Sequence, residues 1–143
     1  MIEGLQDSGA IGALSKVLQF TAQRQRIIAN NIANLSTPGF RPTDVSVEEF
    51  QQQLSDALDE QRTSGSANSA LVLRDTQEVH DDGGRMVLEP QPIGDNIMFH
   101  DGNDRNVEST MQDLVENFMA FRTAASLMKK QFDTINLAIS GRV

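Results

Sequence analysis

The chain has 143 residues and a formal net charge of −8, from 20 acidic and 12 basic side chains, and it contains no cysteine, tryptophan or tyrosine. The lack of cysteine excludes a disulfide framework, thiol catalysis and cysteine-ligated zinc. No run approaches the roughly 20 apolar residues of a membrane span, and the N-terminus lacks the basic-then-apolar order of a cleaved secretory signal, so we expect a soluble chain with no membrane span.

The acidic charge is concentrated in the middle of the chain. Residues 1–42 carry 2 acids and 4 bases, residues 43–106 carry 14 acids and 4 bases, and residues 107–143 carry 4 of each. Because nucleic-acid phosphates select basic surfaces, this distribution argues against nucleic acid as a partner. The same boundaries divide the chain into an N-terminal helix with its following turn, an acidic middle segment and a C-terminal helix.

The N-terminal segment, residues 1–42, has apolar residues at the three- and four-residue steps of a helix. The stripe runs through Ile11, Leu14, Leu18, Thr21, Gln25, Ile28, Ile32 and Leu35. Its two polar members are of the kind that fixes the register of a coiled coil. The helix should stop at residues 36–39, because Pro38 disfavours helical backbone at the residue before it and Pro38-Gly39 suits a type II turn.

The middle segment, residues 43–106, has shorter patterns. Residues 45–58 predict a short helix, and the apolar runs at 71–73, 86–88 and 97–99 predict short strands. Residues 63–69 have the composition of a flexible linker, and turns are predicted at residues 82–84 and 90–92. We therefore expect a lightly structured middle segment with short strands and turns, and with a flexible linker near 60–70.

The C-terminal segment, residues 107–143, has the clearest pattern. Apolar residues alternate steps of four and three without interruption, at Val107, Met111, Leu114, Phe118, Phe121, Ala125, Met128, Phe132, Ile135 and Ile139. This heptad seam predicts one coiled-coil helix about 50 Å long. We expect Asn106 to cap its N-terminus and Gly141 to end it in the left-handed conformation.

The chain shows no pattern of catalytic or cofactor-binding residues. His80 lies among acidic residues at 78, 81 and 82, a combination that metals use, but the glycines that follow favour a solvated acidic turn. His100 is a lone histidine. Residues 101–112 begin like a calcium loop and then lack its glycine at the sixth position and its glutamate at the twelfth. We therefore predict no metal, no cofactor and no enzymatic activity.

The most specific segment is Ala29-Asn30-Asn31-Ile32-Ala33-Asn34-Leu35-Ser36-Thr37-Pro38-Gly39-Phe40-Arg41. Helical spacing places Asn30, Asn31 and Asn34 along one side of the last turns. Each amide offers both donors and an acceptor. From composition alone, the asparagines and Pro-Gly are explained as residues that terminate a helix.

This segment resembles the N-terminal signature of the axial proteins of the bacterial flagellum, an asparagine-rich helix end followed by a Thr, Pro or Gly turn and an aromatic residue. Within that family the chain is most similar to the short rod proteins. It has no large inserted domain, Ala22-Gln23-Arg24-Gln25 precedes the signature, and Asp101-Gly102-Asn103 leads into the C-terminal helix. The resemblance is weakest at residues 60–95, and the quoted residues do not decide between neighbouring rod proteins.

The resemblance implies a mainly α fold whose long N- and C-terminal helices pair as an antiparallel coiled coil. It implies a structural subunit of the flagellar basal body, in the proximal, periplasmic part of the rod, that transmits torque, lines the export channel and is exported without a cleaved signal peptide. The implied partners are copies of the chain, other rod proteins, basal adaptor proteins and the type III export gate. The expected subunit-interface residues are Asn30, Asn31, Asn34, Pro38, Gly39, Phe40, Leu14, Leu18, Ile28, Ile32, Met111, Leu114, Phe118, Phe121, Met128, Phe132 and Ile135.

Two other functions fit parts of the same sequence. A soluble helical adaptor or chaperone would bind a partner helix through the same stripes, as a monomer or closed dimer, whereas a rod subunit should be loosely folded alone and gain helix on assembly. A metal-dependent enzyme would need divalent-cation affinity at His80, which calorimetry detects.

Overall fold

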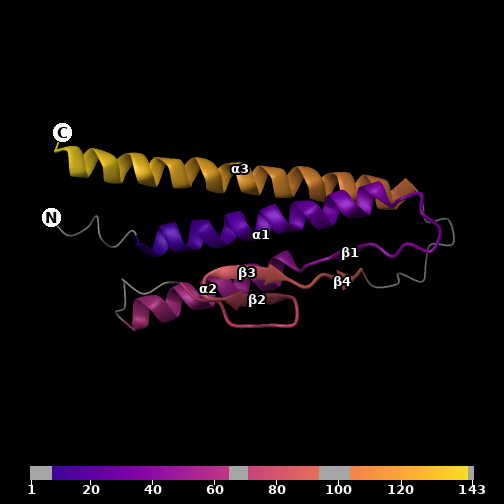
Figure 1. Cartoon of the computed structure of the whole chain (residues 1–143), viewed down its shortest axis with the longest axis horizontal. Helices are drawn as coiled ribbons and strands as arrows, with labels where there is room; N and C mark the ends of the chain where they lie inside the picture. The colour runs from indigo at the N-terminus through magenta and orange to yellow at the C-terminus, as the bar shows by residue number, and fades with distance from the viewer. Residues whose placement is uncertain (1–7, 65–70, 94–103, 142–143) are drawn as a thin grey trace.

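The computed structural model describes residues 8–64, 71–93 and 104–141. Three helices and four short strands are present in this part of the chain (Figure 1). In chain order they are α1 (Ser8–Ala33), β1 (Thr43–Asp44), α2 (Val47–Thr63), β2 (Val79–Asp82), β3 (Arg85–Leu88), β4 (Gln91–Pro92) and α3 (Asp104–Ser140). The predicted class, mainly helical with short strands between two long terminal helices, is confirmed.

The elements lie in layers with α1 in the centre (Figure 1). α3 runs alongside α1 in the opposite direction, so the start of α1 and the end of α3 lie at the same end of the molecule. α2 and the strands lie on the other side of α1. The long central helix α1 therefore lies between two neighbours, α3 and the middle segment.

The hydrophobic core lies between α1 and the middle segment. Its buried members are Phe20, Val45, Phe50, Ala57, Leu71, Leu73, Val79 and Met86. The rings of Phe20 and Phe50 stack with their centroids 4.0 Å apart and their planes 5° from parallel. Ala13, Val17 and Ile27 pack against this cluster. α1 therefore has a second apolar face, which the predicted stripe through Leu14 and Leu18 does not contain.

The helix ends differ from the predictions by a few residues. α1 ends at Ala33, ahead of the predicted stop. α2 extends to Thr63, beyond the predicted end at 58. The prediction stopped early because the last turn of α2 is polar and carries no apolar pattern. α3 begins at Asp104, so the predicted N-cap Asn106 lies inside its first turn. The predicted end at Gly141 is confirmed by a φ of 61°.

α2 is fastened at its start by a side-chain cap. The Ser46 hydroxyl accepts a hydrogen bond from the Glu49 N–H at 3.1 Å, as an N-cap residue does. The Ser46 N–H donates to Glu78 Oε2 at 2.7 Å, next to the beginning of β2. The cap therefore also ties α2 to the strands.

Two antiparallel strand pairs complete the middle segment. β2 and β3 form a hairpin whose two loop residues, Gly83 and Gly84, have φ of 60° and 96°. β1 pairs with β4, with Thr43 opposite Pro92. The predicted strand at 86–88 lies in β3. Residues 71–73 form no strand but bury Leu71 and Leu73, and the predicted strand at 97–99 lies outside the described residues.

Glutamine side chains of α1 hold the free edge of β3. Gln19 Oε1 accepts the Met86 N–H at 2.8 Å, while Gln23 Nε2 donates to the Met86 carbonyl at 2.7 Å and Gln23 Oε1 accepts the Leu88 N–H at 3.2 Å. Residues four apart on a helix are about 6 Å apart along its axis, close to the roughly 7 Å between residues two apart on a strand. The helix therefore pairs with β3 through its side chains.

A buried ion pair joins α1 to β2. Lys16 Nζ lies 2.6 Å from Asp81 Oδ2, and the two side chains are 5% and 0% exposed. Asp81 also accepts the N–H groups of Leu73 at 3.0 Å and Gly84 at 3.1 Å. Burial alone would raise the pKa of Asp81, but the hydrogen bonds from Lys16 and from these N–H groups outweigh it and hold the pKa below its usual value.

Candidate assembly surface

The asparagine-rich end of α1 is held by local hydrogen bonds. Asn34 Nδ2 donates to the Asn30 carbonyl at 2.9 Å and to Asn30 Oδ1 at 3.1 Å, and Asn34 Oδ1 accepts from the Thr37 hydroxyl at 3.3 Å. Asn30 is exposed and Asn34 is half-buried. These two amides lie on one side of the helix, as their spacing predicts.

Asn31 makes different contacts. Its side chain is buried, with the residue only 3% exposed, and both ends of its amide bind one residue of β1. Nδ2 donates to the Thr43 carbonyl at 2.7 Å, and Oδ1 accepts the Thr43 N–H at 3.2 Å. The Asn31 amide therefore makes its hydrogen bonds inside the chain.

The turn after the helix has the predicted form. The Phe40 N–H donates to the Thr37 carbonyl at 3.2 Å, with Pro38 and Gly39 between them, and Gly39 has a φ of 75°. This is the arrangement of a type II turn. Thr37, Pro38 and Gly39 are exposed, and Phe40 is half-buried. The tip of the turn is therefore open to solvent in the single subunit.

Replacing Gly39 with Val is expected to lower rod assembly while the subunit is still secreted. A Cβ at Gly39 meets no atom within 4 Å, so the cost comes from the backbone conformation, about 1–2 kcal/mol for a left-handed residue. Secreted subunit and assembled basal bodies are to be quantified together. Gly39→Asn is the matched control, because asparagine tolerates this conformation. Normal assembly of Gly39→Val would contradict a role for the turn geometry.

The contact between α1 and α3 is centred on polar and small side chains. Asn117 is 3% exposed, and its Nδ2 donates to the Thr21 carbonyl at 2.9 Å and to Gln25 Oε1 at 2.8 Å. Ala124 is the other fully buried residue of α3. Of the two polar positions predicted in the α1 stripe, Gln25 thus meets a polar partner through its side chain, which can fix how the helices align. Thr21 takes part only through its backbone carbonyl, because its hydroxyl donates to the Val17 carbonyl at 2.7 Å.

Arg24 links α1 to both β1 and α3. Its guanidinium makes two hydrogen bonds to the Asp44 carboxylate, at 2.9 and 2.6 Å, and lies 3.6 Å from Asp113 Oδ1. Burial raises the pKa of Asp113, and the negative charges of Asp44 and Glu116 add to that effect, while Arg24 opposes it. Asp113 therefore belongs to the contact between the helices.

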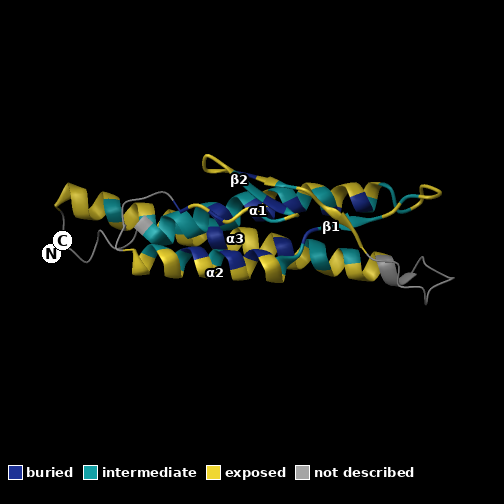
Figure 2. Ribbon diagram, turned by 90° about the horizontal axis from the view of Figure 1, so that it is seen from below, coloured by how far each residue is buried: buried dark blue, intermediate teal, exposed yellow. Residues whose placement is uncertain are grey.

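α3 turns many of its large apolar residues toward solvent. Phe118 and Phe132 are each 50% exposed, and Ile139 is 80% exposed. The C-terminal part of α3 is coloured as exposed in Figure 2. We call Met111, Phe118, Phe121, Phe132 and Ile139 the α3 stripe, because all are exposed members of the predicted heptad seam.

Only part of the predicted seam packs within the subunit. Leu114, Met128 and Ile135 are half-buried, whereas the α3 stripe is exposed, because α1 contacts the helix face of Asn117 and Ala124, one position away from Phe118 and Ala125. On α1, Ile28 is buried and Leu14, Leu18 and Ile32 are half-buried. Sequence reasoning did not identify Asn117, Arg24 and Asp113 as contact residues. The signal that could have found them was the presence of polar residues in the α1 stripe, because a polar residue at a helix contact calls for a polar partner.

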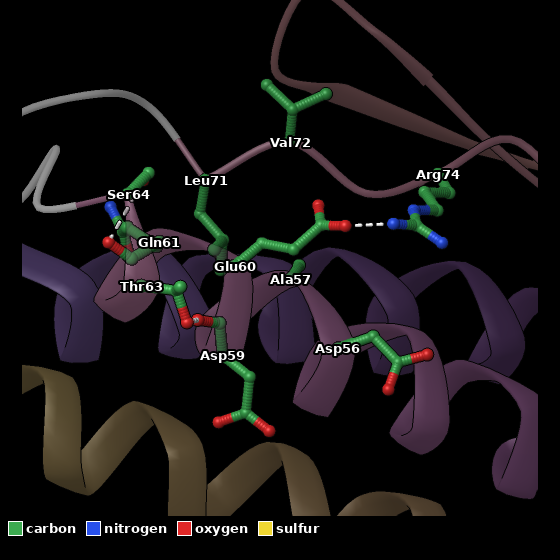
Figure 3. Close-up of a pocket in the computed structure, with 10 residues that line it drawn as sticks. All are labelled: Asp56, Ala57, Asp59, Glu60, Gln61, Thr63, Ser64, Leu71, Val72 and Arg74. Carbon is green, nitrogen blue, oxygen red and sulfur yellow. Dashed lines mark hydrogen bonds and ion pairs between the residues drawn. The ribbon is translucent and has the colours of Figure 1, made fainter.

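A shallow groove of about 750 Å³ lies between the end of α2 and residues 71–74 (Figure 3). It is lined by Asp56, Ala57, Asp59, Glu60, Gln61, Thr63, Ser64, Leu71, Val72 and Arg74. Glu60 pairs with Arg74 across it (Figure 3). Its lining combines the three carboxylates of Asp56, Asp59 and Glu60 with one arginine, Arg74.

His80 lies in β2 and not in the predicted turn. Its side chain is 38% exposed, with Nδ1 4.0 Å from Asp75 Oδ1 and Nε2 3.8 Å from Glu89 Oε1. Within residues 8–64, 71–93 and 104–141, no group of three histidine, cysteine, aspartate or glutamate side chains is placed to hold a metal ion. His100 and residues 101–103, with which the loop that resembles a calcium site begins, lie outside these ranges.

Two comparisons with known proteins agree with this geometry. The family model "Flagella basal body rod protein" matches residues 11–41, which contain most of α1 and the signature turn. Across the described ranges, no helix is long and apolar enough to cross a membrane. No solved structure gives a significant match.

Curated relatives match over most of the chain, and each of the following is described as flagellar basal body rod protein FlgB. The protein of Borrelia hermsii is 27% identical over 128 residues, 87% of this chain and 90% of that protein. The protein of Yersinia enterocolitica is 28% identical over 130 residues, 86% and 88% of the two chains. The protein of Bacillus subtilis (strain 168) is 25% identical over 134 residues, 94% and 95% of the two chains.

Proposed function

The chain belongs to the FlgB family of flagellar basal body rod proteins, and from this premise we propose that the α3 stripe is the surface through which it joins neighbouring subunits of the rod. The family confirms the predicted resemblance and the prediction of a structural, non-enzymatic rod subunit. It also confirms the predicted choice of the proximal rod protein among the rod proteins, because the matched relatives are described as FlgB. Assembly with other rod proteins follows from the family.

The single observation that carries the proposal is the exposure of the α3 stripe. A small monomeric protein seldom exposes a continuous apolar band along a whole helix, and such bands mark interaction surfaces. Burying Phe118 and Phe132 against a neighbour would contribute about 25 cal/mol for each Å² of apolar surface covered. The subunit therefore gains most from its longest helix when copies or other rod proteins cover it.

α1 offers a complementary surface on the side away from the core. Ser15, Ala22 and Ala29 recur at seven-residue intervals along α1, and the last two are exposed. Ala29 is nine residues from Phe20, so at 100° per residue it lies on the opposite side of the helix. Small residues at heptad spacing allow a neighbouring helix to approach closely and to insert large side chains. Packing of one α3 stripe on a neighbour's α1 is a heterologous contact, which propagates along a shaft.

The remaining partners and tasks are part of the same proposal. The exposed turn at Pro38 and Gly39, with Asn30 and Asn34 beside it, contacts neighbouring subunits, and the predicted basal adaptor and export-gate proteins lie below them. The subunit occupies the proximal rod in the periplasm, transmits torque and lines the export channel. The two long helices side by side support this, because they give the subunit an elongated, rod-like core.

Phe118→Asp is expected to abolish rod assembly and to leave the fold of the isolated subunit the same as in the wild type. Phe118 is half-exposed in the subunit, so the substitution costs little there, but a carboxylate buried without a partner in an assembled interface costs several kcal/mol. Secreted subunit, its circular dichroism and the number of assembled basal bodies are to be measured.

Ser126→Asp is the matched control, since it places the same charge at an exposed position of α3 outside the stripe. It should assemble normally. A Phe118→Asp subunit that builds normal rods would remove the α3 stripe from the interface. A stable closed dimer of the wild-type chain would favour the adaptor function instead.

A further inference from the structure

The chain leaves α1 at Ala33 and returns to it at Thr43. Two side chains of α1 hold the returning strand, Asn31 at Thr43 and Arg24 at Asp44. Asn31 and Arg24 are seven residues apart and so lie on the same face of the helix. Residues 34–42 thus form a loop that is closed at its base by side chains, with the turn at 37–40 at its exposed end.

The contact at Asn31 satisfies both backbone groups of one residue, Thr43. The amide donates to the Thr43 carbonyl and accepts the Thr43 N–H, which is the pairing that a neighbouring strand would supply. Aspartate at position 31 would lack the donor, leucine would lack both groups, and glutamine would be longer by one methylene group. Asparagine alone combines both groups at this length.

We propose that Asn31 is a positioning residue: it closes the base of the 34–42 loop and thereby holds the turn at Pro38 and Gly39 in the conformation in which it meets a neighbouring subunit. This rests on the proposed function of the turn as a contact. The three signature asparagines then divide their roles. Asn30 and Asn34 stand at the exposed helix end, while Asn31 acts on the turn through Thr43 and does not touch the neighbour.

Three charged groups face this region. Arg24 precedes Asn31 on α1, Asp44 follows Thr43 on β1, and Asp113 approaches Arg24 from α3. The residues of β4 opposite β1, Gln91 and Pro92, carry no charge. A carboxylate introduced at position 31 would feel attraction from Arg24 and repulsion from both aspartates.

Asn31→Asp provides a test with a pH readout. At neutral pH its carboxylate would face the Thr43 carbonyl without a proton to donate, so amide hydrogen exchange at residues 37–43 should be at least about tenfold faster than in the wild type at the same pH. At a pH where this carboxyl is protonated, its O–H restores the donor. The ratio of variant to wild-type exchange rates should then fall back toward one.

Two further variants separate pairing from size. Asn31→Leu should exchange quickly at every pH, because it restores neither group. Asn30→Asp, at an exposed neighbouring position, should exchange like the wild type. Wild-type protection in Asn31→Asp, or an exchange ratio that does not change with pH, would contradict the proposal that Asn31 closes the base of the loop.

Assembly of the same variants distinguishes this inference from the function on which it rests. If Asn31 closes the loop and the turn contacts a neighbouring subunit, Asn31→Asp loosens the turn and lowers the number of basal bodies about tenfold at neutral pH. If exchange rises as expected but basal bodies form normally, Asn31 positions a turn that is not a subunit contact. That result would reject the turn as a subunit contact, while the closure of the loop by Asn31 would stand.

Discussion

Replacing Asp81 with Asn should remove a large part of the folding stability of the subunit. The substitution keeps the size of the side chain but leaves the buried Lys16 ammonium without its counter-ion, which costs about 3–5 kcal/mol. A domain has a net stability of roughly 5–15 kcal/mol, so much of the purified variant should be unfolded at moderate temperature. Thermal and urea unfolding followed by circular dichroism measure the loss.

Two controls identify the ion pair as the cause. Asp82→Asn removes the neighbouring, exposed carboxylate and should change stability by less than about 0.5 kcal/mol. The double variant Lys16→Met with Asp81→Leu should recover much of the loss, because it removes both charges together. A double variant that is as unstable as Asp81→Asn would mean that the hydrogen bonds of Asp81 to Leu73 and Gly84 dominate.

The pH dependence of the wild type has a defined sign. The folded-state pKa of Asp81 is lowered, so its contribution is fully present above the pKa of the unfolded carboxyl group and is lost as the pH falls through the folded value. Stability of the wild type should therefore fall on acidification through this range. Asp81→Asn should lack that part of the fall.

Phe20→Ala should be destabilising to a similar degree, by about 3–5 kcal/mol. Phe20 is 2% exposed and stacks on Phe50, so its removal leaves a cavity where α1 meets the middle segment. Phe132→Ala removes the same ring from a half-exposed position on α3 and should change the stability of the isolated subunit much less. Equal losses for the two variants in urea unfolding would contradict the placement of the core.

The sequence predicted the features that depend on local spacing. The long C-terminal helix, its end at Gly141 and the turn at Pro38-Gly39 all follow from heptad repeats and from residues with restricted backbone angles. The two polar residues of the α1 stripe also indicated that it does not face only apolar neighbours, and Gln25 indeed meets Asn117 through its side chain.

The sequence did not predict which face of each helix is covered. Spacing identifies an apolar stripe, but α1 has two buried faces, and the second includes Phe20 together with the polar residues Lys16 and Gln23 that a hydrophobic pattern excludes. Likewise, Phe118 is more apolar than Asn117, yet Asn117 faces α1. The choice depends on partners distant in sequence, and for Phe118 the partner proposed here is another subunit.

Gln19 and Gln23 of α1 protect the subunit against one form of aggregation, the growth of a β-sheet between molecules. An exposed strand edge recruits strands from other molecules, and crowding of many copies at one site increases that risk. Gln19 and Gln23 occupy the N–H and carbonyl of Met86 and the N–H of Leu88, so these groups of the β3 edge are not available to extend a sheet into another molecule. Growth by intermolecular sheet, the route to amyloid-like deposits, is thereby blocked at β3, and the helices remain the surface available for ordered polymerisation.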